Sequence, residues 1–132
     1  MSAEPAVYLD SSALVKLVVR ERESSGLRSY LRSRPRQVSC GLARVEVVRA
    51  VRPQGQLAVE RARRLLLQVG LLRLDDSLLD DAALVGVTLR SLDAIHLAAA
   101  LTLAGNLSEI VTYDVHMADA ARRLGLSVVS PV

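Results

Sequence analysis

The sequence predicts a single α/β domain of three layers, in which helices cover both faces of a mainly parallel sheet of about five short strands. Short apolar runs alternate with longer segments of helical periodicity along the whole chain. This alternation is typical of parallel strands joined by helical crossovers. A length of 132 residues also suits one domain with its own core. We therefore expect residues 1–132 to form one domain with an α/β/α order of layers.

Short apolar runs bounded by polar or turn residues predict the strands. They lie at residues 6–9, 37–40, 71–74, 109–113 and 127–129. Apolar residues at helical spacing predict helices at residues 13–19, 23–34, 42–52, 57–69, 77–85, 92–103 and 115–124. Pro35, the Pro53-Gln54-Gly55 break and Gly125 mark helix ends. The segment 92–103 is apolar nearly all round, so its polar Asp93 and His96 require an explanation.

Composition limits the classes of function. About half of the residues (51%) are apolar, but Phe and Trp are absent, so the core must be aliphatic. The single cysteine, Cys40, cannot form an internal disulfide, and we interpret it as a small buried strand residue in a cytoplasmic protein. No stretch resembles a signal peptide or reaches the ~18 apolar residues of a membrane span. Sixteen of the seventeen basic residues are Arg, which favours phosphate binding or simply reflects the base composition of the genome.

Four acids occupy places where a parallel sheet carries its binding site. Asp10 and Asp114 close the first and fourth predicted strands, and ligands of open parallel sheets bind beyond the carboxyl ends of strands. Asp93 follows Ser91, a candidate helix cap, and so projects from the first turn of a buried helix. Glu46 lies among Val45, Val47 and Val48, where a carboxylate is out of place unless it faces a cation.

Each acid also has a plain structural interpretation. Asp10 and Asp114 could cap the helices that follow them, Asp93 could complement a helix dipole, and Glu46 could pair with Arg49. Four converging acids differ from four separate ones, because crowded like charges destabilise the fold unless a cation neutralises them. Oxygen ligands without a His or Cys cluster favour Mg²⁺ or Mn²⁺.

Four short motifs carry a resemblance to a known family. They are Tyr8-Leu9-Asp10-Ser11-Ser12-Ala13-Leu14-Val15-Lys16, Ala43-Arg44-Val45-Glu46, Leu92-Asp93-Ala94-Ile95-His96-Leu97-Ala98 and Val111-Thr112-Tyr113-Asp114. In order and spacing they resemble the acidic motifs of PIN-domain nucleases, and most closely the VapC toxins of bacterial toxin–antitoxin (VapBC) pairs. The resemblance covers nearly the whole chain.

The resemblance implies a role for each matching residue. Asp10 and Asp93 would be the principal ligands of Mg²⁺ or Mn²⁺, with Glu46 and Asp114 completing the pocket directly or through water. Ser12 and Thr112 match hydroxyl positions that support this arrangement. The implied activity is endoribonuclease hydrolysis that leaves a 5′-phosphate and a 3′-hydroxyl, with tRNA or ribosomal RNA as substrate. The implied partners are a VapB-like antitoxin and a second copy of the chain in a homodimer.

Other residues have simpler interpretations. We expect His96 to be a hydrogen-bonded core residue rather than a base or ligand, and Asp119 to form a surface ion pair with Arg122 or Arg123. His116 departs from the family pattern and could touch substrate. The acidic run Asp75, Asp76, Asp80 and Asp81 suggests a strand exit and a solvated helix face. Some of Leu65, Leu66, Leu67, Leu71 and Leu72 could form a dimer or antitoxin surface, although core packing is the default.

Two other classes of function compete with the nuclease. A PIN-like module that binds nucleic acid or protein without catalysis would not need to tolerate four crowded acids. A phosphatase of the haloacid dehalogenase type needs a second Asp two residues after the first, where this chain has Ser12.

Overall fold

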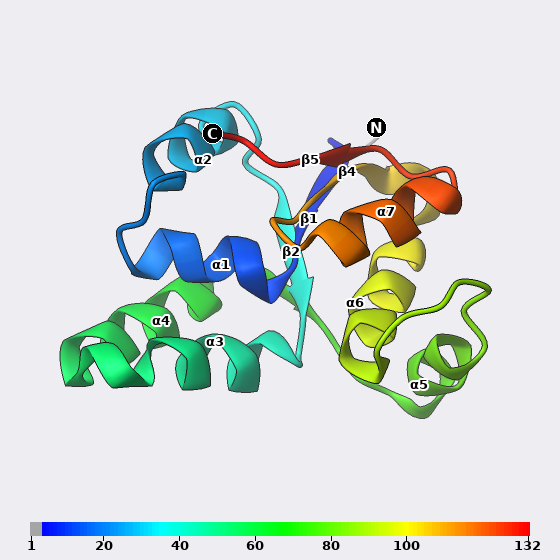
Figure 1. Ribbon diagram of the computed structural model, residues 1–132, viewed down its shortest axis with the longest axis horizontal. Coiled ribbons are helices and arrows are strands. Elements are labelled where there is room, and N and C mark those ends of the chain that lie inside the picture. The colour runs from blue at the N-terminus through cyan, green and yellow to red at the C-terminus, as the bar shows by residue number, and fades with distance from the viewer. Residues whose placement is uncertain (1–3) are drawn as a thin grey trace.

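The computed structural model describes residues 4–132, in which strands and helices alternate (Figure 1). The strands are β1 (Ala6–Leu9), β2 (Gln37–Cys40), β3 (Gly70–Leu72), β4 (Leu107–Val111) and β5 (Val128–Val129). The helices are α1 (Ser11–Val18), α2 (Ser24–Leu31), α3 (Ala43–Val51), α4 (Gln56–Gln68), α5 (Asp76–Ala83), α6 (Ser91–Leu101) and α7 (Val115–Arg123). Two short 3-10 turns, η1 (Arg52–Gln54) and η2 (Ala104–Asn106), complete the described elements.

The five strands form one parallel sheet in the order β3-β2-β1-β4-β5, which confirms the predicted fold class. From β1 the chain moves outward through β2 and β3, and then returns to place β4 and β5 on the other side of β1. The order therefore reverses between β1 and β4, where parallel sheets carry their ligand crevice. Asp10 leaves β1 at this point, and its backbone N–H donates to the Val111 carbonyl at 3.2 Å.

Alternation along β1 divides the core into two halves. Val7 and Leu9 pack with buried residues of α1 to α4, whereas Ala6 and Tyr8 pack with residues of α6 and α7 on the opposite face. Successive side chains of a strand point to opposite faces, so one four-residue strand contributes to both halves. Figure 1 shows α1, α3 and α4 on one side of the sheet and α6 and α7 on the other. Both halves are aliphatic, as the composition requires.

Some element boundaries differ from the sequence-based prediction. β4 covers 107–111 instead of 109–113, and Thr112, just beyond its end, donates its N–H to the Val129 carbonyl and its hydroxyl to Asp10. β3 covers 70–72 instead of 71–74. Ser91 was expected to cap α6, but it is the first helical residue and Arg90 holds the N-cap position. Because β4 ends at Val111, Asp114 lies three residues beyond the strand instead of closing it, and it caps α7.

Two predictions about the environment of the chain can be compared with the structure. Cys40 is fully buried in β2, as expected for a small core residue. Within residues 4–132, no helix combines the length and apolar character that a bilayer crossing requires.

Candidate active site

Asp10 directly follows β1 and is the most deeply buried of the four predicted acids. Its side chain caps α1, because Oδ1 accepts a hydrogen bond from the Ala13 N–H at 3.1 Å. The Ser12 hydroxyl donates to the same oxygen at 2.6 Å, and the Thr112 hydroxyl donates to Oδ2. The side chain is only 4% exposed. Burial raises the pKa of this carboxyl, although the bonds from Ser12 and Thr112 oppose the rise.

Glu46 lies in the first turn of α3 and joins the pocket through α1 and α6. Its Oε1 accepts hydrogen bonds from the Ser11 hydroxyl at 2.7 Å and from His96 Nε2 at 2.6 Å. Burial favours a raised pKa for Glu46, but the bonds from His96 and Ser11 outweigh it and lower the pKa. Glu46 therefore pairs with His96 and Ser11, not with Arg49 one turn further along the helix.

His96 connects the pocket to the core. It is 3% exposed, its Nδ1 lies 2.8 Å from the Tyr8 hydroxyl, and Cys40 Sγ is 3.7 Å from the same nitrogen. Burial would lower the pKa of His96, but the interactions with Cys40 and Glu46 raise it to about 10. His96 is thus a hydrogen-bonded core residue, as predicted, and is positively charged at neutral pH.

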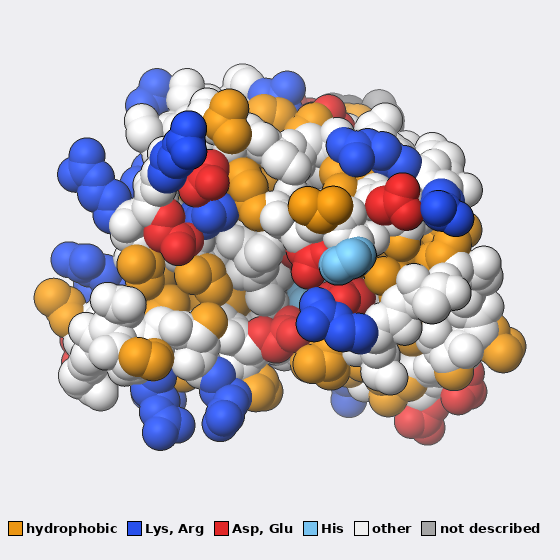
Figure 2. Space-filling view, in the orientation of Figure 1, with side chains coloured by type: hydrophobic (Ala, Val, Ile, Leu, Met, Phe, Trp, Pro, Cys, Tyr) orange, Lys and Arg blue, Asp and Glu red, His pale blue; other side chains and the backbone are white. Residues whose placement is uncertain are grey.

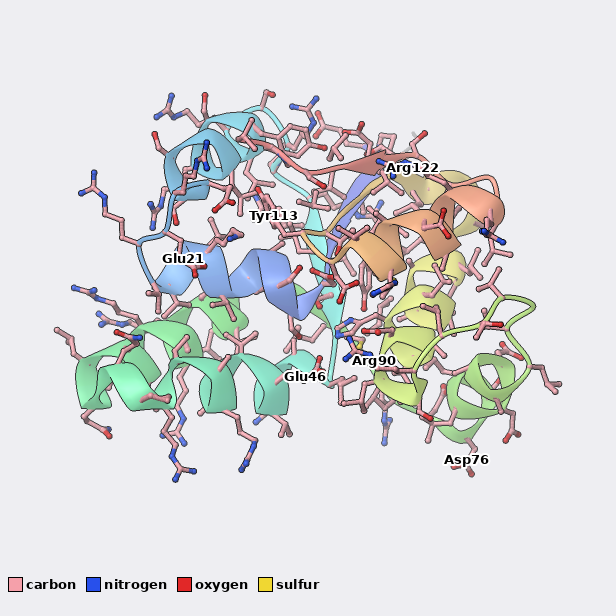
Figure 3. All side chains as sticks on the ribbon, in the orientation of Figure 1. Glu21, Glu46, Asp76, Arg90, Tyr113 and Arg122 are labelled. Carbon is pink, nitrogen blue, oxygen red and sulfur yellow. The ribbon has the colours of Figure 1, made fainter. Side chains whose placement is uncertain are left out.

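Asp93 and Asp114 face a common cation, the guanidinium of Arg90. Arg90 Nε lies 3.1 Å from Asp93 Oδ2, and Arg90 Nη2 lies 3.3 Å from Asp114 Oδ2. The other oxygen of Asp114 caps α7 by accepting from the N–H groups of His116 and Met117. Figure 3 labels Arg90 beside the start of α6 and Glu46 at the start of α3.

A chain of contacts links the four predicted acids. The Thr112 hydroxyl donates to Asp10 and accepts from the Asp114 N–H at 3.1 Å, and Asp114 shares Arg90 with Asp93. Glu46 joins through Ser11, the residue that follows Asp10. Figure 2 shows acidic side chains gathered in the hollow between the two halves of the molecule, beside blue and pale-blue side chains. The structure thus brings the predicted acids to one region at the β1–β4 switch point.

The donor chemistry of this pocket fits a divalent cation. Every predicted ligand is a carboxylate oxygen, the ligand type that Mg²⁺ and Mn²⁺ prefer. Two of the carboxylates already converge on one positive group, Arg90. In the described part of the chain, however, no three His, Cys, Asp or Glu side chains are close enough together to form a complete metal site. In this conformation each acid accepts at least one hydrogen bond from the protein, and a cation bound to Oδ2 of Asp93 and Oδ2 of Asp114 would have to replace the contacts of Arg90.

Asp119 and the acidic run 75–81 lie outside this pocket, whereas His116 lies at its edge. Asp119 pairs with Arg123 at 3.0 Å on the surface of α7, and Asp75 caps α5 through the Leu78 N–H. Asp76, Asp80 and Asp81 are exposed. His116 is exposed next to Asp114 and lines a surface hollow with Asp93 and Arg90. These positions confirm the surface ion pair and the solvated helix face, and the α5 cap at Asp75 was not predicted.

The sequence reasoning missed two residues that contact the predicted acids. Arg90 stands three residues before Asp93, a spacing that places both on one side of a helix start. This three-residue spacing could have predicted the Arg90–Asp93 ion pair from the sequence. Ser11 bonds to Glu46 across 35 positions of sequence, and no local pattern reveals such a pairing. Ser12, where a dehalogenase-type phosphatase needs a second Asp, instead supports Asp10 with its hydroxyl.

Comparison with known proteins assigns this chain to a family. Residues 7–123 match the PIN domain, and the chain therefore belongs to the PIN-domain family. Among its relatives is ribonuclease VapC46 of Mycobacterium tuberculosis, 52% identical over 127 residues that cover 96% of this chain and 98% of the relative. Ribonuclease VapC47 of the same species is 40% identical over 131 residues, covering 95% of this chain and 96% of that protein.

Solved structures share the fold at low sequence identity. M. tuberculosis VapC20, described as a toxin that cleaves the sarcin–ricin loop, superposes with a TM-score of 0.75 and 18% identity, over 95% of this chain and 99% of that one. A chain from a toxin–antitoxin complex of Klebsiella pneumoniae gives a TM-score of 0.74 and 19% identity, over 96% and 98% of the two chains. These likenesses support the predicted arrangement of the sheet and helices.

Proposed function

We propose that this chain is a VapC-type endoribonuclease that hydrolyses RNA phosphodiester bonds with a divalent cation, Mg²⁺ or Mn²⁺. The observation that carries the proposal is the pair of carboxylates, Asp93 and Asp114, that converge on one cation beside Asp10. It occurs in a chain 52% identical to ribonuclease VapC46 over nearly its full length.

In this proposal Asp10, Asp93, Glu46 and Asp114 form the catalytic and metal-binding set. A divalent cation in such a pocket neutralises charge on the scissile phosphate and makes water a better nucleophile. Ser12 and Thr112 keep the Asp10 carboxylate in one orientation by donating to its two oxygens. Asp93 Oδ2 and Asp114 Oδ2 each contact the Arg90 guanidinium, the first at Nε and the second at Nη2.

Glu46 is placed for a second role, as a proton acceptor or a ligand through water. Ser11 and His96 both bond to Oε1, so among residues 4–132 no hydrogen bond engages Oε2. The positive charge of His96 keeps the carboxyl ionised. Oε2 is therefore available to water in the hollow, and the bonds to Oε1 fix its direction.

The substrate and partners follow from the same family membership. Attack by water does not require a ribose 2′-hydroxyl, so RNA specificity rests on the ribonuclease relatives. We propose exposed loops of tRNA or ribosomal RNA as targets, since single-stranded loops offer accessible bonds. An antitoxin partner is supported by the toxin–antitoxin complexes among the structural neighbours.

We also propose a homodimer. Leu67 on α4 is 86% exposed and lines a hollow of about 360 Å³ with Val48, Leu66 and Leu71. Light scattering behind size-exclusion chromatography would measure the mass, and a monomer at all concentrations would contradict the proposed dimer.

The test of the nuclease is RNA cleavage by the purified chain with Mg²⁺ or Mn²⁺ and with EDTA. We expect cleavage only with metal, products with 5′-phosphate ends, and loss of activity in Asp93→Asn. Asp119→Asn, which alters a surface ion pair away from the pocket, is the matched control and should cleave normally. Cleavage in EDTA, or equal cleavage by Asp93→Asn, would reject the proposal.

A further inference from the structure

Arg90 stands at the boundary between a loop and α6 and bridges two acids from different helices. Its backbone occupies the N-cap position of α6 without forming a side-chain cap. The side chain instead reaches Asp93 Oδ2 at 3.1 Å through Nε and Asp114 Oδ2 at 3.3 Å through Nη2. No other Lys or Arg in residues 4–132 forms a salt bridge with any of the four pocket acids.

The bridge addresses the repulsion between the two carboxylates. Asp93 and Asp114 direct one oxygen each at the same guanidinium, whose planar fork can serve two acceptors at once. The positive charge also favours the ionised form of Glu46. Without Arg90 or another cation, no positive group would offset the repulsion between the carboxylates of Asp93 and Asp114.

Arg90 is also free to leave. Its side chain is 77% exposed, against 18% for Asp93 and 26% for Asp114. The preceding residues, 84–90, contain no helix or strand, so the side chain can rotate into solvent without repacking the core. A divalent cation bound through the same two Oδ2 atoms would displace the guanidinium, because both positive groups cannot occupy one position.

We propose that Arg90 is the internal counter-ion of the metal-free pocket, that it competes with the divalent cation, and that it turns to an RNA phosphate when the cation displaces it. The inference rests on the proposed function of this pocket. Released at the rim of the acidic hollow, the guanidinium lies near the substrate backbone and can form the two-pronged hydrogen bonds that phosphate accepts. Each time a cation binds, Arg90 thus exchanges the carboxylates of Asp93 and Asp114 for an RNA phosphate.

Mn²⁺ titration of the full chain tests the competition without measuring cleavage. Free Mn²⁺ is followed by electron paramagnetic resonance in wild type, Arg90→Gln, Arg90→Lys and Arg123→Gln. Arg123 also pairs with an aspartate, Asp119, but outside the pocket. We expect Arg90→Gln to bind Mn²⁺ more tightly by up to about fivefold, the upper end of what one exposed ion pair is worth. Arg90→Lys should lie between this variant and wild type, and Arg123→Gln should match wild type.

Thermal denaturation supplies an independent readout. In EDTA, Arg90→Gln should melt below wild type, and saturating Mn²⁺ should remove most of that difference, since both proteins then contain the same cation. Steady-state cleavage of a short RNA at saturating Mn²⁺ should show a raised KM with little change in kcat for Arg90→Gln.

The outcomes separate this inference from the proposed function. Equal or weaker Mn²⁺ binding by Arg90→Gln, with wild type binding normally, would overturn the counter-ion role alone. An unchanged KM would overturn the phosphate contact. Failure of every variant, wild type included, to bind Mn²⁺ would overturn the proposed metal site and this inference with it.

Discussion

Replacing His96 by Gln should destabilise the fold by removing the positively charged partner of Glu46. The His96 ring lies between Glu46 on one side and Tyr8 on the other, at 2.6 and 2.8 Å. Gln can still donate an amide hydrogen bond to Glu46, but it carries no charge and cannot satisfy both partners with the geometry of the ring. The variant therefore measures mainly the contribution of the charged His96–Glu46 contact to the free energy of unfolding.

The size of the effect follows from burial and from the type of bond. A hydrogen bond to a charged group contributes about 1.5–3 kcal/mol, and His96 is 3% exposed, so little solvent is available to replace the bond. Glu46 retains a 25% exposed side chain, which places the expected loss in the middle of that range, about 2 kcal/mol. In a domain of this size the melting temperature should fall by about 6–8 °C.

The pH dependence has a definite sign. The pKa of His96 is about 10 in the folded protein and ordinarily 6.5, so its charge stabilises the fold fully below pH 6.5. That contribution is lost as pH rises from 6.5 toward 10. The difference in the free energy of unfolding between wild type and His96→Gln should accordingly be largest at pH 6 and smallest near pH 10.

Urea denaturation followed by circular dichroism at pH 6, 8 and 10 measures this difference. His116→Gln is the matched control, because His116 is exposed and should change stability little at any pH. Cys40 lies beside His96 Nδ1, so the series is repeated in a Cys40→Ser background to separate the thiol from the imidazole. A variant as stable as wild type at pH 6, or a difference that is constant from pH 6 to 10, would refute a charged His96.

Four further predictions follow from the same contacts. Asp10→Asn should abolish cleavage with little loss of stability. Asp10→Ala should be less stable than Asp10→Asn by about 1 kcal/mol, because it also loses the α1 cap. Equal melting temperatures of the two variants would contradict this expectation. Thr112→Val should cost about 1–2 kcal/mol and reduce kcat, measured by denaturation and RNA cleavage, because Asp10 Oδ2 loses its donor. Asp75→Ala should cost about 1 kcal/mol through the α5 cap but leave cleavage unchanged, and a cleavage defect would place this acid in the site. Saturating Mn²⁺ should raise the melting temperature of wild type but not of Asp93→Asn, and an equal shift in both would remove Asp93 from the metal site.

The fold could be predicted from the sequence because its signals are local. Apolar runs such as 6–9 stop at turn residues, and the alternation of strands with helices indicates a parallel sheet. Strand ends were less certain, since tertiary contacts decide them. Thr112 continues an apolar run, yet it lies beyond the end of β4, and its hydroxyl bonds to Asp10, 102 positions away in sequence.

The candidate site was predictable in its acids but not in their partners. Asp10, Glu46, Asp93 and Asp114 could be found because carboxylates at strand ends and on apolar helices are unusual. The bond of Ser11 to Glu46 and that of Arg90 to Asp114 depend on how distant segments pack, whereas the bond of Arg90 to Asp93 is local. His96 was predicted as a satisfied core residue, but nothing local indicated that its partner would be Glu46, 50 positions earlier.

Asp10 and Asp114 each begin a helix as well as facing the acidic hollow. Most replacements at these positions should therefore lower the amount of folded protein in a cell along with any activity. Asn is the exception, because its side-chain oxygen can also accept from a helix N–H. Aspartate and asparagine codons differ by one base, so a single mutation can give an inert but well-folded chain. Such a chain would keep its surface and would still occupy any inhibitor that recognises it.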